Sequence, residues 1–116
     1  MKSFRECEAW KKSMDLVDKV YDAVKWFPVE ERYTLGDQLQ RAVVSIPSNI
    51  AEGFGRDSHR DFAHFLMQAR GSLFEVDTQL EIASRRGFIT NFTEFAPLMN
   101  EISKLIGSLH SWLSSH

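Results

Sequence analysis

Apolar residues return every three or four positions along almost the whole chain, and this rhythm is the strongest constraint on its fold. A spacing near 3.6 residues places side chains on one face of an α-helix, whereas a half-buried β-strand requires strict alternation. No segment of the sequence alternates convincingly with a period of two. The pattern therefore predicts an all-α protein.

Four segments carry the helical pattern, with glycine, proline and polar residues between them. The apolar stripes that we expect to form the core are Cys7, Trp10, Met14, Val17, Tyr21 and Val24; Leu35, Leu39, Ala42, Ile46, Ile50 and Gly53; Phe62, Phe65, Ala69, Leu73, Val76, Leu80 and Ala83; and Phe95, Leu98, Ile102, Leu105, Leu109 and Trp112. Long amphipathic helices joined by short connections predict an antiparallel up-down four-helix bundle, formed as one domain by residues 1–116.

The ends of the predicted helices carry local signals. Gly53 is suited to the left-handed position that follows the second helix. Ser58 begins a capping-box pattern before the third helix. We expect the fourth helix to begin at Asn91 or Thr93, with Pro97 in or near its first turn, where a missing N–H is best tolerated.

Charge and cysteine content argue against several classes of protein. The 14 Lys and Arg residues do not outnumber the 16 Asp and Glu residues, whereas a dedicated nucleic-acid domain usually has a basic excess. No stretch approaches the roughly 18 apolar residues of a membrane span. The single Cys7 offers neither an internal disulfide nor a zinc or redox motif. We expect a cytoplasmic protein without a membrane or cofactor partner.

The stretch RAVVSIPSNIAEG, residues 41–53, places a proline inside the second predicted helix. Pro47 lacks an N–H and leaves the carbonyl of Val43 without its usual donor, which predicts a kink. Val44, Pro47 and Ala51 form an apolar face that, on a helical wheel, points away from the predicted core.

The third predicted helix also carries a second apolar file. Opposite the core stripe lie Ala63, Met67, Gly71, Phe74 and Thr78. An aligned apolar file beside a glycine suggests close packing with a partner. We predict that this file meets the other apolar face in a neighbouring copy, so the expected subunit interface is Val44, Pro47, Ala51, Met67, Gly71 and Phe74.

A polar stripe runs along the remaining side of the second helix. Its members are Arg41, Ser45, Asn49 and Glu52. Arg41 and Glu52 stand about 16 Å apart on a helix and cannot pair with each other. We favour a structural polar network here; a ligand or nucleic-acid site and a merely solvated face are the alternatives.

No combination of residues predicts catalysis. A di-iron bundle needs inward carboxylates and a Glu-x-x-His motif on two helices. The nearest match is DFAH, in which Asp61 and His64 point outward beside Phe62. We therefore expect a protein that is not an enzyme and holds no metal.

Several stretches resemble a known family. RAVVSIPSNIAEGFGR, FAHFL, ARGSLFEVDTQLEIA and RRGFI, together with AWKKSMDLVDKVYDAVKWFP, are similar to bacterial four-helix-bundle proteins, some of whose genes lie in intervening sequences of large-subunit ribosomal RNA. The resemblance implies a homo-oligomer, typically a pentameric ring. The wider superfamily is similar to the accessory protein of diversity-generating retroelements, which binds reverse transcriptase and nucleic acid.

Two functional hypotheses follow. The first is a homo-oligomeric scaffold or adaptor whose ligand is another protein. The second is an RNA- or DNA-binding ring, in which symmetry would gather Arg41, Arg56, Arg60 and Arg70 into one basic surface. The surface potential of the assembled oligomer discriminates between them.

Overall fold

The computed structural model describes residues 2–116, which form helices and no strand. The long helices are α1 (Glu8–Val24), α3 (Leu35–Phe54), α4 (His59–Arg85) and α5 (Ala96–Ser115). The short elements are the 3-10 helices η1 (Phe4–Glu6) and η2 (Phe92–Glu94) and the one-turn helix α2 (Val29–Arg32). The prediction of an all-α four-helix bundle is confirmed.

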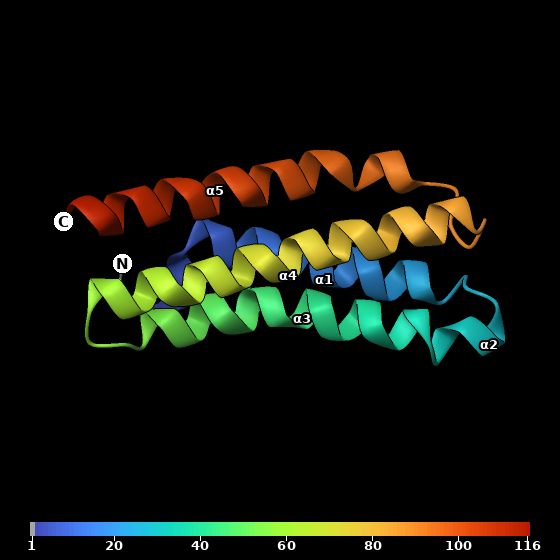
Figure 1. The fold of residues 1–116 in the computed structure, drawn as a ribbon, viewed down its shortest axis with the longest axis horizontal. Coiled ribbons are helices and arrows are strands. Elements are labelled where there is room, and N and C mark those ends of the chain that lie inside the picture. The colour runs from blue at the N-terminus through green and yellow to red at the C-terminus, as the bar shows by residue number, and fades with distance from the viewer. Residues whose placement is uncertain (1) are drawn as a thin grey trace.

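The four long helices lie side by side along the longest axis of a body measuring 46 × 23 × 20 Å, and each runs opposite to the one before it (Figure 1). Both α1 and α4 pack against α3 and α5, so within residues 2–116 α1 and α4 occupy diagonal corners of the bundle. The bundle therefore has four outer faces, each lying between two neighbouring helices. None of the helices in this part of the chain is long and apolar enough to cross a bilayer.

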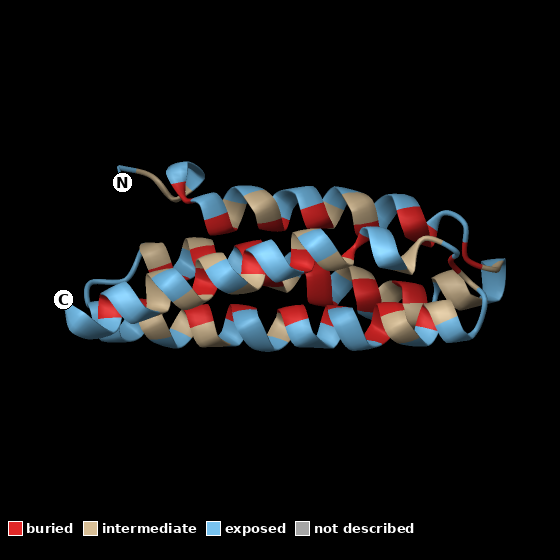
Figure 2. Ribbon diagram, turned by 90° about the horizontal axis from the view of Figure 1, so that it is seen from above, coloured by how far each residue is buried: buried red, intermediate tan, exposed pale blue. Residues whose placement is uncertain are grey.

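The hydrophobic core runs the length of the bundle, and buried residues recur along the inward side of each long helix (Figure 2). On α3 and α4 the predicted residues form most of it, since all of them are buried except the half-buried Leu35 and Phe65. Val43 and Leu66, which the predicted stripes did not include, are fully buried as well. On both helices most of the large aliphatic residues share the buried face, and Val44 and Ile82 are the exposed exceptions. Sequence periodicity therefore identified the inward sides of α3 and α4 correctly.

On α1 and α5 the predicted core stripe is partly wrong. Met14, Tyr21 and Trp112 are exposed, at 38%, 42% and 47% of their surface. The side chains buried in their place are Ala9, Ser13, Leu16, Val20 and Ala23 on α1, and Met99, Ile106 and Leu113 on α5. The buried Ser13 hydroxyl is satisfied because it donates a 2.6 Å hydrogen bond to the carbonyl of Ala9. On α1, small and aliphatic residues thus face the core, while Met14 and Tyr21 lie outside it.

The helix ends differ from expectation at Gly53. This glycine does not follow α3 but is buried within its last turn, and the helix ends one residue before Gly55. The left-handed position falls instead at Gly87, where φ is 76° directly after α4. The predicted cap of α4 is confirmed, because the Ser58 hydroxyl accepts a hydrogen bond from the Asp61 N–H at 3.1 Å.

The start of the fourth long helix was predicted too early. The turn η2 occupies residues 92–94, so α5 begins at Ala96 rather than at Asn91 or Thr93. Pro97 lies in the first turn of α5, as expected. Helix α3 continues through Pro47 without interruption, and a kink there stays a prediction.

Helix α3 approaches α4 closely at Gly53, and this contact generates a stability prediction. A Cβ at this position would lie 2.8 Å from the Cβ of Phe65 and 2.9 Å from a ring carbon of Phe62. Gly53→Ala should therefore destabilise the protein by about 1–3 kcal/mol through overpacking. The matched control Gly107→Ala meets no atom within 4 Å and should stabilise by about 0.5–1 kcal/mol through helix propensity. Urea unfolding measures both changes; equal shifts would contradict the close approach.

Candidate functional site

The second apolar file of α4 reaches the surface at Phe74. This ring is 50% exposed, whereas Met67 and Ala63 are half-buried and pack against the core. Gly71 lies between Met67 and Phe74 along this file, and no atom lies within 4 Å of the position that a Cβ would occupy there. The Arg70 guanidinium lies 5.3 Å from the centre of the Phe74 ring. We call the residues Met67, Gly71 and Phe74 the α4 patch.

The apolar face predicted on α3 is only partly exposed. Val44 is 39% exposed and Ala51 is half-buried. Pro47, which we expected to point away from the core, is buried instead. The correction has a simple cause, because α1 packs over this side of α3.

The exposed side chains of α1 extend this face across the helix boundary. Met14 and Tyr21 share one side of α1, and Tyr21 lines a shallow pocket with Gln40 of α3. Because Gln40 and Val44 stand one turn apart on α3, the two sets border the same groove. We call Met14, Tyr21, Val44 and Ala51 the α1–α3 face. The helical spacing of Met14 and Tyr21 predicted that both lie in the core, so their part in the α1–α3 face was missed.

The two apolar surfaces lie on different sides of the bundle. The side of α4 that faces α3 is occupied by Phe65 and Ser72. The helical positions of Met67 and Phe74 place the α4 patch on the other side of that helix, toward α5. Because α1 and α4 occupy diagonal corners of the bundle, the α1–α3 face and the α4 patch lie on different sides of it.

The polar stripe of α3 divides into an inner and an outer part. The Ser45 and Ser72 hydroxyls lie 2.8 Å apart and join α3 to α4. The Asn49 amide donates to the carbonyl and the hydroxyl of Ser45, at 2.8 and 2.9 Å. Glu52 and Arg41 are exposed. Ser72 was missed from the sequence, because a hydroxyl partner on another helix leaves no periodic signal.

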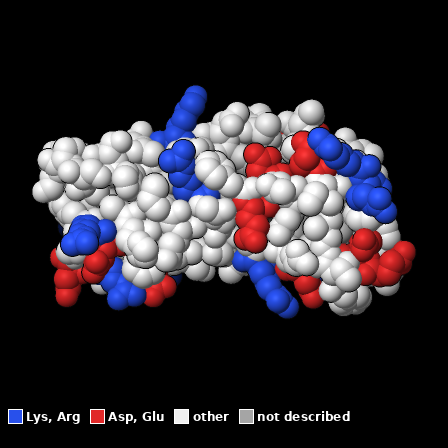
Figure 3. All heavy atoms as spheres, viewed as in Figure 1, with Lys and Arg blue, Asp and Glu red and all other residues white. Residues whose placement is uncertain are grey.

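The three arginines proposed for nucleic-acid contact lie on α4 or just before it. The Arg56 guanidinium lies 3.0 Å from the Glu52 carboxylate and 4.7 Å from the centre of the Phe65 ring. Arg60 and Arg70 are exposed. Figure 3 shows acidic and basic side chains side by side at both ends of the visible face. This face of a single chain therefore offers no continuous positive track.

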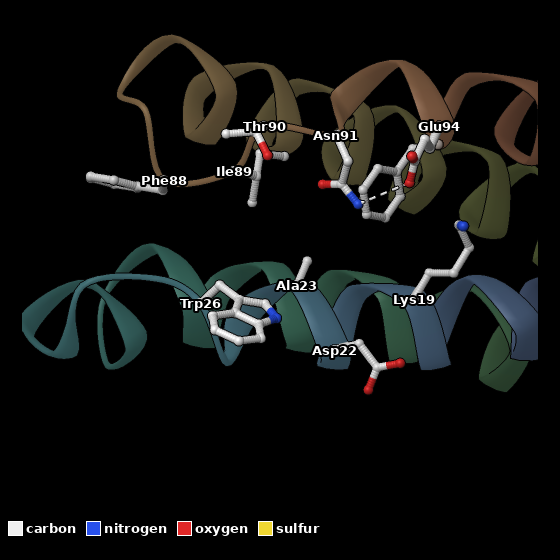
Figure 4. Close-up of a pocket in the computed structure, with 10 residues that line it drawn as sticks. Lys19, Asp22, Ala23, Trp26, Phe88, Ile89, Thr90, Asn91 and Glu94 are labelled. Atoms are coloured by element: carbon white, nitrogen blue, oxygen red, sulfur yellow. Dashed lines mark hydrogen bonds between the residues drawn. The ribbon is translucent and has the colours of Figure 1, made fainter.

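A pocket of about 640 Å³ lies between α1 and the connection from α4 to α5 (Figure 4), at the end of the bundle opposite the connection from α3 to α4. Trp26, 82% exposed, forms one wall. Lys19, Asp22 and Glu94 also line it, and Glu94 accepts a 3.2 Å hydrogen bond from the Asn91 amide. The lining contains both basic and acidic side chains, so its charge favours no single class of ligand.

Together these features define a four-helix-bundle protein that exposes apolar side chains on α1, α3 and α4. Residues 5–109 match the family of the 23S rRNA-intervening sequence protein, and the chain belongs to that family. No curated protein is significantly similar in sequence.

A solved structure has the same fold. It is a protein of unknown function from the S23 ribosomal protein family of Bacteroides thetaiotaomicron, determined by crystallography. It is 25% identical to this chain, with a TM-score of 0.81, and the match covers 89% of this chain and 95% of that one. The similarity extends over the whole bundle.

The contact between the Ser45 and Ser72 hydroxyls generates a second stability prediction. Ser45→Ala removes that contact and one acceptor of the Asn49 amide, so it should destabilise the protein by about 1 kcal/mol. Ser48→Ala is the control, because Ser48 is exposed on the same helix and should change stability by less than about 0.5 kcal/mol. Thermal unfolding compares the two; indistinguishable variants would contradict a structural role for Ser45.

Proposed function

We propose that this chain is a non-enzymatic scaffold that assembles from identical copies into a ring, with a pentamer of the 13.4 kDa chain as the favoured form. The observation that carries this proposal is the placement of two exposed apolar surfaces on different sides of one bundle. A single copy leaves Phe74 and Val44 in water, at 50% and 39% exposure. Burying a side chain of this kind stabilises a complex by about 1.5–3 kcal/mol.

The geometry favours a head-to-tail interface. When one surface of a protein binds a different surface of the next copy, each copy keeps one free surface for a further subunit. Such an interface produces a ring if the rotation closes and a filament if it does not. The α1–α3 face of one copy would bind the α4 patch of its neighbour, with the open space beside Gly71 admitting the partner.

A nucleic-acid-binding ring is the second candidate. The observation in its favour is that Arg56 and Arg60 flank the same connection between α3 and α4, so a ring would repeat them around one rim. Against it, Glu52 lies 3.0 Å from Arg56, and acidic residues 57 and 61 adjoin the same two arginines. The protein scaffold is therefore our conclusion.

The head-to-tail interface predicts a specific result from two variants. Val44→Asp and Phe74→Asp should each dissociate the oligomer and leave the chain helical, because a carboxylate buried in an apolar interface is strongly unfavourable. Mixing the two variants should restore a dimer, since each retains the surface that the other lacks. Native mass spectrometry at micromolar concentration detects both outcomes, and a wild-type protein that is monomeric would contradict the proposal.

Leu73→Asp is the control for folding. Leu73 precedes Phe74 but is only 2% exposed and faces the core. Its replacement should unfold the chain, whereas Phe74→Asp should not, and circular dichroism distinguishes them. Equal loss of helicity in both variants would show that Phe74 belongs to the core.

The nucleic-acid alternative makes its own prediction. Phosphate contacts release counterions, so the affinity for structured RNA would fall steeply as salt rises. On the scaffold account, we expect no more than weak binding at physiological salt, with no difference between wild type and the double variant Arg56→Glu, Arg60→Glu. Filter binding across a salt series tests this. Tight, salt-dependent binding that the double variant abolishes would favour the nucleic-acid ring.

A further inference from the structure

A polar pocket of about 320 Å³ opens between α3 and α4. It is lined by Gln38, Arg41, Ala42, Ser45, Glu75 and Gln79. Both walls come from a single chain, so a monomer carries this pocket as fully as a ring does. The subunit contacts proposed above use the α1–α3 face and the α4 patch and leave this groove free.

Gln79 is the unusual member of this set. Its side chain lines the pocket but is only 8% exposed. Its Oε1 atom is buried, and no group within residues 2–116 donates a hydrogen bond to it. Buried polar atoms in native proteins nearly always have a partner, so an acceptor left alone beside a pocket points to a donor that enters from outside.

Two opposite charges flank this acceptor. Arg41 stands on the α3 wall and Glu75 on the α4 wall, and both are exposed. Two other acidic residues of these helices have a basic partner four positions further along the chain, Glu52 with Arg56 at 3.0 Å and Glu81 with Arg85 at 2.8 Å. Within the described chain, no such ion pair involves Arg41 or Glu75, and they do not pair with each other across the pocket.

We propose that this pocket binds a small zwitterion of the α-amino acid class. The ligand's ammonium group would donate to Gln79 Oε1 and to the Glu75 carboxylate on the α4 wall. Its carboxylate would accept from the Arg41 guanidinium on the α3 wall. The terminal torsion of a glutamine is broad, so Gln79 can turn its oxygen toward the entering ammonium.

Charge complementarity selects this class over simpler ligands. A lone cation would be attracted by Glu75 but repelled by Arg41. A lone anion would be attracted by Arg41 but repelled by Glu75. A neutral amide could bond Gln79 but would leave both charges without a counter-charge. A group with a cation and an anion two bonds apart matches all three side chains at once.

Glycine is the probe, and glycine betaine is the matched control. Betaine carries the same two charges, but its quaternary nitrogen has no N–H to donate to Gln79. In NMR titrations of the intact protein, glycine should shift the side-chain signals of Gln79 and Arg41 saturably, and betaine should not. N-acetylglycinamide tests a neutral amide in the same way. No shift with glycine at tens of millimolar, or equal shifts with all three compounds, would overturn the proposal.

Variants separate binding from a structural role. Glu75→Gln and Arg41→Gln should each weaken glycine binding at least about tenfold, because each removes a charged partner. Gln79→Leu should abolish the Arg41 response while raising the melting temperature, since it replaces an unpaired buried amide with an apolar side chain of similar size. Lys19→Gln, in the pocket of Figure 4, should leave glycine affinity unchanged. Undiminished binding in both charge variants would contradict the assignment.

Discussion

The close packing of α3 against α4 is the contact on which the rest of the structure depends. The two helices form the most extensive pair in the bundle. Gly53 permits their close approach where any larger residue would meet Phe62 and Phe65. The Ser45 and Ser72 hydroxyls, 2.8 Å apart, join them further along. Helices α1 and α5 pack against this pair and complete the four-helix bundle. The α1–α3 face and the α4 patch then lie on different sides of the bundle.

The α3–α4 pair is also where sequence reasoning succeeded best. Most of the large aliphatic residues there repeat on the buried face, so for these residues hydrophobic size and burial coincide. On α1 they do not, because Ala9 and Ser13 are buried while Met14 and Tyr21 are exposed. A periodic pattern shows where large side chains stand on a helix but not which neighbour covers them. Gly53 was misassigned for the same reason, since its role is to admit residues of another helix.

The candidate surfaces were predictable only in part. Phe74 and Val44 are exposed, as the second apolar file of α4 and the apolar face of α3 implied, but Pro47 is buried where α1 packs on α3. The predicted polar stripe lies on α3, whereas Ser72 and Gln79 lie on α4 and could not be paired with it from one sequence. The groove between these helices exists only once both are placed, and its unpaired Gln79 acceptor emerges only from the packed structure.

Chemical cross-linking tests the head-to-tail account most directly. Cysteines replacing both Val44 and Phe74 in one chain would be joined between copies by a short bis-maleimide, while the native Cys7 is 3% exposed and protected. The account predicts a ladder of covalent multimers from this double variant on a denaturing gel, and only monomers from either single variant. Monomers alone from the double variant, or dimers from a single one, would contradict an interface between two different faces of the bundle.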